Sequence, residues 1–401
     1  MHGLRVTIVG AGIGGLSAAL ALHRFGHHPR VLEQTHRLRP VGAGISLWPN
    51  GIKVLNLLGL GQEVAAMGGT MERMAYADQT GRELLDFPLS ELYERVGERA
   101  WPVARAEFQD LLLTKVRSEI GPDAVQLGVR INEAIESDEG VCLLTEDGRS
   151  FEADLVVAAD GTHSVLREHV AGESIERHYV GYVNWNGLVD DVSGIADPDT
   201  WLTWVGDGQR ASVMPVGGER AYYFFDIPVS AEEFGQWDRA AGDGIDFFGH
   251  RETLSAHFEG WAKPVMRLIE RLDPARVARV PIFDLDPLPT WSRGRVVLLG
   301  DAAHAMAPDL GQGGCQAMED AWVLAHYLTA TTLSTIDALE RYQAERIPHT
   351  ADIVRRARKR AELTHGVDPI ATEAWYRSLE TDGHQGIVDG LAQSVETGPC
   401  R

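Results

Sequence analysis

The sequence predicts an α/β fold in which a Rossmann-type domain is combined with a second domain, built on a mixed antiparallel sheet, and with C-terminal helices. Three observations support this expectation. A glycine-rich turn joins an apolar strand to a helix near the N-terminus, short β-rich segments follow one another between residues 182 and 227, and strand–helix alternation returns after Pro281. At 401 residues the chain is also long for a single core, so two closely packed domains are expected.

The first strand, helix and second strand form a βαβ unit around the glycine-rich turn. Residues 4–9 are a continuous apolar run typical of a strand buried on both faces, and residues 14–25 and 29–33 are typical of a helix and a second strand. The turn between the first two elements matches GxGxxG. In such a unit the backbone approaches a pyrophosphate at the helix N-terminus, and the last glycine packs helix on strand. The predicted dinucleotide site includes Gly10, Gly12, Ile13, Gly14 and Gly15.

Glu33 closes the second strand and is followed by Gln34, which we include in the same site. A carboxylate at this place accepts hydrogen bonds from the adenosine ribose hydroxyls and repels a 2′-phosphate. The site is therefore expected to take FAD or NAD and not NADP. A glycine-rich turn without a ligand stays as the alternative.

Four β-rich segments separated by turn residues, at 182–189, 200–205, 210–216 and 220–227, predict an antiparallel sheet. Two apolar strands on either side of this region end in short polar motifs. The strand at 155–159 ends in Asp160-Gly161, and the strand at 295–299 ends in Gly300-Asp301 and is followed by Pro308 and Gly311-Gln312-Gly313-Gly314. Ligands of doubly wound folds bind at the carboxyl ends of such strands, where an Asp can hold sugar-chain hydroxyls. A helix at 316–328 and a long charged helix at about 336–363 follow.

Taken in order, the three strand-end motifs resemble those of the aromatic-ring flavoprotein monooxygenases of the para-hydroxybenzoate hydroxylase type (group A), over nearly the whole chain. The resemblance implies bound FAD, with NADH or NADPH as a transient co-substrate that needs no second GxGxxG, and O2 as oxidant. It also implies roles for individual positions. Gly10, Gly12, Gly15 and Glu33 would hold the ADP half of FAD, and Val129 would contact the adenine. Arg105 would bind the ribityl and phosphate region, and Asp301 would bind the ribityl chain. Asp160 and Gly161 would contact both FAD and NAD(P)H, and the isoalloxazine would lie against Gly311, Gln312, Gly313 and Gly314.

Within that family, the segments 45–51, 181–187, 210–215, 222–226 and 364–366 resemble the bacterial FAD-dependent urate hydroxylases. The resemblance implies hydroxylation of urate to 5-hydroxyisourate through a flavin C4a-hydroperoxide, in purine degradation. Urate is an electron-rich anion, so its site needs a fixed cation and hydrogen-bond partners more than a strong base. The planar fork of Arg210 suits that role, and Tyr222 is placed to orient the opposite edge. The loop around Pro308 is expected to border the same site.

Arg210 and Tyr222 can act together only if their side chains face one side of the sheet. That condition holds if Gly217-Gly218-Glu219 forms a three-residue loop that pairs Met214 with Tyr222, and it fails with a two-residue loop. The sequence leaves the register open. The alternatives are a surface charge at a sheet edge for Arg210 and core packing for Tyr222.

The predicted domains are discontinuous. An FAD-binding domain covers 1–75, 100–176 and 281–363, a substrate-binding sheet domain covers 76–99 and 177–280, and a C-terminal segment covers 364–401. A hydroxylase for salicylate or another phenolic acid would share all three motifs and differ only in the pocket. A flavin-dependent oxidase or dehydrogenase without oxygen insertion is a further alternative.

Composition narrows the partners. The formal net charge of −21 disfavours nucleic acid and anionic membranes, and no apolar run is long enough to span a bilayer. The fifteen histidines show no metal-binding spacing, so no metal is expected. Three cysteines without a CxxC pair fit a reducing cytoplasm better than a disulfide framework. The oligomeric state is not predicted.

Overall fold

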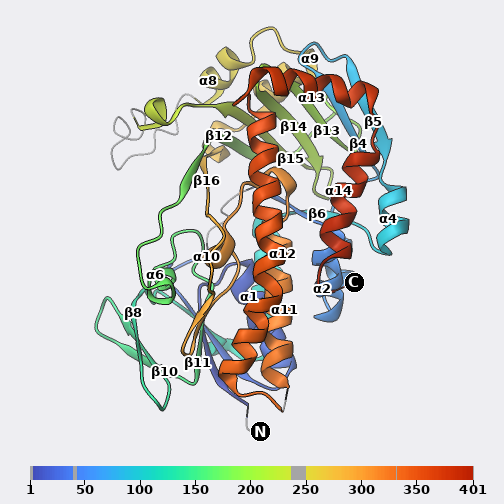
Figure 1. Cartoon of the computed structure of the whole chain (residues 1–401). Helices are drawn as coiled ribbons and strands as arrows, with labels where there is room; N and C mark the ends of the chain where they lie inside the picture. Colours follow the sequence, from blue (N-terminus) through green and yellow to red (C-terminus); the bar gives the residue numbers. More distant parts are fainter. Residues whose placement is uncertain (1–2, 39–42, 236–249, 331, 401) are drawn as a thin grey trace.

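The computed structural model describes residues 3–38, 43–235, 250–330 and 332–400. The predicted domain ranges also include positions 1–2, 39–42, 236–249, 331 and 401, which lie outside the described residues. Figure 1 shows two sheets at opposite ends of the molecule, with long helices running between them.

The first sheet is the predicted Rossmann-type sheet. Its strands are short apolar runs without exposed faces, because helices cover both sides. Neighbouring strands are parallel, except that the edge strand β17 is antiparallel to β18. The order is β17 (Ser292–Arg293), β18 (Val296–Leu298), β11 (Leu155–Ala158), β1 (Arg5–Val9), β2 (His28–Glu33) and β7 (Val125–Leu127). The strands that carry the three predicted motifs, β1, β11 and β18, are therefore adjacent, and their carboxyl ends meet at one edge.

The second sheet has seven strands and forms the other end of the molecule (Figure 1). It is antiparallel apart from one parallel pair, β13 with β4, which agrees with the expected mixed antiparallel sheet. The order is β16 (Ala278–Asp284), β12 (His178–Val189), β15 (Ala221–Pro228), β14 (Gln209–Pro215), β13 (Thr200–Gly206), β4 (Arg73–Asp78) and β5 (Glu83–Pro88). The expected domain limits at residues 76 and 280 fall inside β4 and β16.

Alternation along these strands gives the second sheet two different faces. Tyr223, Phe225 and Ile227 of β15 belong to an apolar cluster that includes residues of α8 and α9. The residues between them, Tyr222, Phe224 and Asp226, point to the opposite side. That side carries many polar groups and faces the Rossmann-type domain.

Two smaller sheets complete the fold. They consist of β10 (Ser150–Ala153), β9 (Val141–Thr145) and β8 (Ile131–Glu136), and of β3 (Gly44–Leu47) and β6 (Trp101–Ala104). The helices of the Rossmann-type half are α1 (Ile13–Arg24), α2 (Pro49–Leu57), α3 (Gly61–Met67), α5 (Arg105–Glu119), η1 (Pro122–Ala124), α6 (Leu166–Ala171), α10 (Asp301–His304), η3 (Pro308–Leu310) and α11 (Gly313–Thr329). Those at the second sheet are α4 (Ser90–Val96), α8 (His250–His257), α9 (Lys263–Arg271), η2 (Pro274–Arg276), α13 (Pro369–Thr381) and α14 (Gln385–Glu396).

The predicted long charged helix is α12 (Thr335–Thr364), which begins with a capping box at Ser334 and Asp337. It packs on α10 and α11 in the Rossmann-type half and on β12 and α13 at the second sheet. Figure 1 shows α12 running along the front of the molecule from one sheet to the other.

Candidate active site

A cavity of about 660 Å³ lies at the edge where β1, β2 and β11 end. Seven residues of the predicted cofactor site line it: Gly10, Gly12, Glu33, Gln34, Val129, Asp160 and Gly161. The structure thus brings together residues as far apart in the sequence as Gly10 and Gly161.

The glycines of the GxGxxG turn are needed for different structural reasons. Gly10 has a φ of +107°, and a Cβ there would lie 2.3 Å from the carbonyl oxygen of Ala159. A Cβ on Gly15 would lie 2.0 Å from the carbonyl oxygen of Gly10, so this glycine serves helix–strand packing. Gly12 is different, because a Cβ there would meet nothing within 4 Å. Its backbone borders open space, as the close approach of a pyrophosphate requires.

Ile13 and Gly14 lie behind the turn and do not line the cavity. Ile13 is buried as the first residue of α1, and a Cβ on Gly14 would lie 2.8 Å from a side-chain carbon of Leu299. In the described structure these two residues support the turn from the core side.

The Glu33 carboxylate is fixed by the backbone on both sides. Its Oε2 accepts a hydrogen bond from the Ala11 amide at 2.9 Å, and its Oε1 accepts one from the Thr35 amide at 2.8 Å. Each carboxylate oxygen keeps a further lone pair. Glu33 therefore shapes the turn and still presents acceptors to the cavity.

Asp160 presents an incompletely satisfied carboxylate to the same cavity. Its Oδ2 accepts a hydrogen bond from the Val165 amide at 3.0 Å, whereas its buried Oδ1 has no well-formed hydrogen bond within the described chain. Burial raises the pKa of this carboxyl group. A buried oxygen without a partner at a cavity wall fits a ligand hydroxyl group. Together with the open backbone at Gly12, it fits the sugar and pyrophosphate of FAD.

The third motif forms two turns that approach each other. Gly300 has a φ of +64° and places Asp301 at the start of α10, while Gln312 caps the N-terminus of α11. A Cβ on Gly313 would lie 3.9 Å from Oδ1 of Asp301. The free amides at the start of α11 carry the positive end of the helix dipole, which suits the pyrimidine edge of a flavin. Pro308 begins η3, directly before Gly311, whose φ is +63°.

Arg105 begins α5, and its side chain is exposed. Burial raises the pKa of the Tyr222 phenol, and the nearby charge of Arg105 offsets a small part of that rise. The structure thus places Arg105 between the cofactor side and the second sheet. None of the described hydrogen bonds or ion pairs involves its guanidinium.

The second sheet has the register that Arg210 and Tyr222 require. Met214 pairs with Tyr222, and the Val216 amide donates to the carbonyl of Arg220 across a three-residue loop. Arg210 pairs with Asp226, four residues further along both strands. Arg210, Met214 and Tyr222 therefore share the polar face of the sheet, and the alternative two-residue loop is wrong.

Arg210, the cation that we expected to bind the substrate, is itself paired with two carboxylates. Its Nε lies 2.7 Å from Oδ2 of Asp226, and its Nη2 lies 3.1 Å from Oδ1 of Asp309. Both carboxylates are fully buried. Burial alone would lower the pKa of Arg210, but the two carboxylates outweigh it and raise that pKa. The guanidinium is thus permanently charged and held in one orientation, with Nη1 as its remaining end.

Asp309 joins this network to the turn that precedes Gly311. Its Oδ2 accepts a hydrogen bond from the Tyr182 hydroxyl at 2.7 Å, and Nε2 of His365 lies 3.5 Å from its Oδ1. The ring of His365 stacks on that of Tyr182, with centroids 3.9 Å apart. Burial would raise the pKa of Asp309, but Arg210 and then His365 hold it well below its usual range. The carboxylate is therefore charged in the folded protein.

Tyr222 packs its ring against the backbone of β3. A Cβ on Gly44 would lie 2.5 Å from the ring, so only a glycine fits there. Burial raises the pKa of the Tyr222 hydroxyl, with a smaller contribution from Asp226. The hydroxyl thus keeps its proton and acts as a hydrogen-bond donor.

Several site residues were missed by the sequence reasoning. Asp226 and Asp309 stood inside segments that were singled out, but nothing in the sequence showed that they would meet Arg210. Gln109, which donates to the carbonyl of Ala11 at 2.8 Å, lies one helical turn after Arg105, and that spacing is a signal that could have found it.

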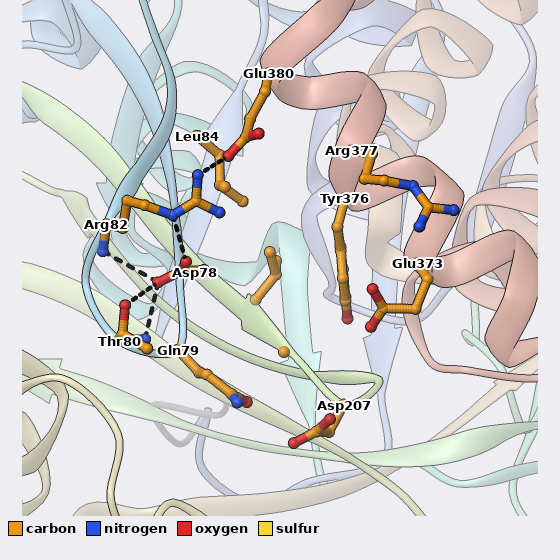
Figure 2. A pocket seen from close by; sticks show the side chains of 12 residues that line it. Asp78, Gln79, Thr80, Arg82, Leu84, Asp207, Glu373, Tyr376, Arg377 and Glu380 are labelled. Atoms are coloured by element: carbon orange, nitrogen blue, oxygen red, sulfur yellow. Dashed lines mark hydrogen bonds and ion pairs between the residues drawn. The ribbon is translucent and has the colours of Figure 1, made fainter.

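A second cavity, of about 230 Å³, lies where two sheet turns meet α13 (Figure 2). Arg82 forms ion pairs there with Asp78 and Glu380, and Tyr376 accepts a hydrogen bond from the Gly208 amide at 3.2 Å. None of the predicted site residues lines this cavity. It lies at the end of the β13–β14 hairpin, where Val205, which lines it, pairs with Arg210 across the two strands.

Within the part of the chain that the structure describes, no group of three or more His, Cys, Asp or Glu side chains is arranged to hold a metal ion. Among the described helices, none combines the length and apolar character needed to cross a bilayer.

Comparisons with known proteins agree with this geometry. The family model described as an FAD binding domain matches residues 3–241 and 286–357. An FAD-dependent urate hydroxylase of Klebsiella pneumoniae subsp. pneumoniae is 44% identical over 397 residues, which cover 99% of this chain and 100% of that protein. A 3-amino-4-hydroxybenzoate 2-monooxygenase of Streptomyces cremeus is 36% identical, over 94% of this chain and 92% of that protein.

Among solved structures, Klebsiella pneumoniae HpxO complexed with FAD and uric acid matches with a TM-score of 0.93 at 43% identity, over 100% of this chain and 99% of that one. The family model covers the three strand-end motifs and all strands of the second sheet except β16, and these relatives cover nearly the whole chain. The chain belongs to the family of FAD-binding flavoprotein monooxygenases, and FAD is its cofactor.

Proposed function

We propose that this enzyme hydroxylates urate to 5-hydroxyisourate with NAD(P)H and O2. The observation that carries the proposal is that Arg210 and Tyr222 lie on the same face of the second sheet. The ion pair between Arg210 and Asp309 holds this face against the turn before Gly311. A planar anion bound between those side chains would lie beside the turns that we assign to the flavin. The urate hydroxylases among the relatives support this choice of substrate.

The bound flavin, reduced by NAD(P)H, supplies the chemistry that activates O2 and delivers an oxygen atom. The protein residues bind and orient the substrate. Asp226 and Asp309 fix the Arg210 guanidinium, so little rotamer freedom is lost when its remaining N–H groups engage a urate carbonyl and ring nitrogen. The concentrated positive charge favours the anionic substrate, and the Tyr222 hydroxyl donates to the opposite edge.

We also propose the cofactor contacts residue by residue. Gly10, Gly12, Glu33, Gln34, Val129, Asp160 and Gly161 would hold the adenosine and pyrophosphate half, because they line one cavity. Asp301, Arg105 and the loop from Pro308 to Gly314 would hold the ribityl chain and the ring system. The division into an FAD-binding domain, a substrate-binding sheet domain and a C-terminal segment is part of the same proposal.

The three cysteines are free thiols in the described structure, which fits a role in the reducing cytoplasm.

Two measurements test the function. The purified protein should consume NADH faster when urate is present, and label from ¹⁸O2 should enter the product. An oxidase would release the label as peroxide and water, and a dehydrogenase would work without O2. Either of those results would contradict the proposal.

A phenolic acid hydroxylase is the competing function, because the cofactor motifs would be the same. Titration of the bound flavin separates the two: urate should change its absorption spectrum at micromolar concentration, and salicylate should not. The reverse result would replace urate with a phenolic acid and leave the monooxygenase assignment intact.

A further inference from the structure

The turn that we place against the flavin is attached to a group of polar side chains with almost no exposure to solvent. We call this group the buried polar cluster. Each member is at most 2% exposed, and all lie on α2, α11, α12 or the residue that caps α11. The members are Asn50, Gln312, Gln316, Glu319, Asp320 and Arg346.

Arg346 is the centre of the cluster. Its Nε donates to Oδ1 of Asp320 at 2.7 Å, its Nη1 to Oε2 of Glu319 at 2.9 Å, and its Nη2 to Oε1 of Gln316 at 2.6 Å. A buried guanidinium that meets this many acceptors has one orientation only. Burying these charges is costly, and their attraction seldom returns more than that cost. Stability alone is therefore a weak reason for the cluster.

The charges fix the direction of the neighbouring amides. An arginine only donates, so the Gln316 atom that it contacts must be the oxygen, and the Gln316 Nε2 must be the atom that lies 3.2 Å from Gln312. Asn50 acts in the same way, because its Nδ2 lies 3.1 Å from Oε1 of Glu319 and 3.0 Å from Gln312. Both amides therefore present N–H groups to the same atom of Gln312.

Gln312 is turned by these two donors. Its Oε1 accepts both hydrogen bonds and faces the cluster, so its Nε2 is directed away from the cluster. No described residue forms a hydrogen bond with that Nε2. Gln312 lies between Gly311 and Gly313, and Gly313 faces Asp301.

We propose that the buried polar cluster orients the Gln312 amide so that its N–H groups donate to the pyrimidine edge of the flavin, and that Arg346 is a positioning residue for the cofactor. The inference rests on the flavin site proposed above and extends it. Reduction places negative charge on that edge of the ring, so donors held in advance stabilise the reduced cofactor more than the oxidised one.

A second arm of the cluster reaches the other flavin-facing turn. Oδ2 of Asp320 accepts from the Gly300 amide at 3.0 Å and lies 2.6 Å from Nε2 of His304. The same Asp320 is held by Arg346. One guanidinium thus aligns the Gly300-Asp301 turn and the Gln312-Gly313 turn, which come from separate parts of the chain.

The midpoint potential of the bound flavin tests the proposal, measured on the FAD-loaded protein by equilibration with a reference dye. Gln312→Leu should lower the preference for reduced over oxidised FAD about tenfold, which is about 30 mV for a two-electron couple. Asn50→Leu and Gln316→Leu remove one donor each without changing charge, and each should lower the potential by part of that amount. Arg346→Lys should also lower it, because an ammonium cannot meet all the acceptors.

Coupling between variants distinguishes positioning from a general structural role. In a Gln312→Leu background, Asn50→Leu and Gln316→Leu should cause no further change in potential, because the amide that they orient is gone. If Arg346→Lys does not fold, this comparison still decides the question.

Gln343→Leu is the matched control. Gln343 also lies on α12, where its Oε1 accepts from the Trp291 amide at 2.8 Å and the Thr290 hydroxyl at 3.1 Å, outside the cluster. It should lower thermal stability and leave the potential at the wild-type value. An unchanged potential in Gln312→Leu, or additive shifts in the double variants, would overturn the proposal. If the wild-type protein does not turn over urate, the proposed function is wrong, but this inference is unaffected.

Discussion

Arg210 and Asp309 connect the polar face of the second sheet to the turn beside the proposed flavin site, with Nη2 of Arg210 lying 3.1 Å from Oδ1 of Asp309. The arginine belongs to β14, and the aspartate lies two residues before Gly311. The side chains are 12% and 0% exposed, so the pair is shielded from solvent. Arg210, which we propose binds the substrate, is thus held in place by a residue of the turn that we assign to the flavin.

The Arg210→Gln variant should retain FAD and lose coupling, so that NADH is oxidised with little hydroxylated product. It should also be less stable by about 3–5 kcal/mol, because Asp226 and Asp309 lose their buried counter-charge. Product formed per NADH and the free energy of unfolding check the two effects. Adding Asp309→Asn should restore part of the stability and none of the coupling. An unchanged product yield per NADH would refute the role of Arg210.

Tyr222→Phe should raise the KM for urate about tenfold, since one hydrogen bond to an anion contributes about 1.5–3 kcal/mol at most. FAD affinity should stay the same. Tyr223→Phe is the matched control, because Tyr223 is the next residue and belongs to the apolar cluster on the other face. Equal effects of the two substitutions on KM would show that the polar face does not select the substrate.

Glu33→Gln should weaken FAD binding about tenfold, which is about 1.4 kcal/mol. The amide can replace only one of the two acceptors that hold the Ala11 and Thr35 amides, and it presents fewer lone pairs to the ribose. Quenching of flavin fluorescence by the apoprotein measures the affinity. Glu146→Gln changes another carboxylate at the same cavity, one that is 70% exposed, and should have little effect. A Glu33→Gln protein with wild-type affinity would exclude the carboxylate from the site.

Acid should destabilise the protein through His349. Burial, and then the Arg346 cation, lower the pKa of His349 from 6.5 to about 4, although Glu319 lies 3.6 Å away. The unfolded chain therefore takes up a proton at higher pH than the folded one does. The stabilisation is complete above pH 6.5 and is lost as the pH falls toward 4, with a size of about 3 kcal/mol. The difference in unfolding free energy between wild type and His349→Gln should change by that amount across this interval. A constant difference would contradict the shifted pKa.

Local patterns predicted much of the Rossmann-type half. Residues 4–9, 14–25 and 29–33 were expected to form strand, helix and strand, and the structure has β1, α1 and β2 there within one or two residues. These elements could be predicted because apolar runs and glycine positions depend on near neighbours in the sequence. The agreement at the second sheet is partial, since four of its seven strands were predicted, whereas β4, β5, β16 and the parallel pairing of β13 with β4 were not.

The electrostatic surroundings of the site could not be predicted. Arg210 meets Asp226 through cross-strand pairing and Asp309 through packing of the two halves, at sequence separations of 16 and 99 residues. No local pattern encodes such a contact. The buried polar cluster is a similar case, because Asn50 and Glu319 are 269 positions apart.

The helix α12 has a consequence for how molecules reach the reaction site. At 1.5 Å per residue its 30 residues extend for about 45 Å. Arg346, in the first half of the helix, lies behind the turns that we assign to the flavin, and Arg358, in the second half, holds the buried Asp284 of β16 with two hydrogen bonds. A hinge motion of one half against the other would have to break one of these anchors or bend the helix, which contains Pro348 between them. This double anchoring favours entry and release of substrate and nicotinamide by local displacements over a hinge motion of the two halves.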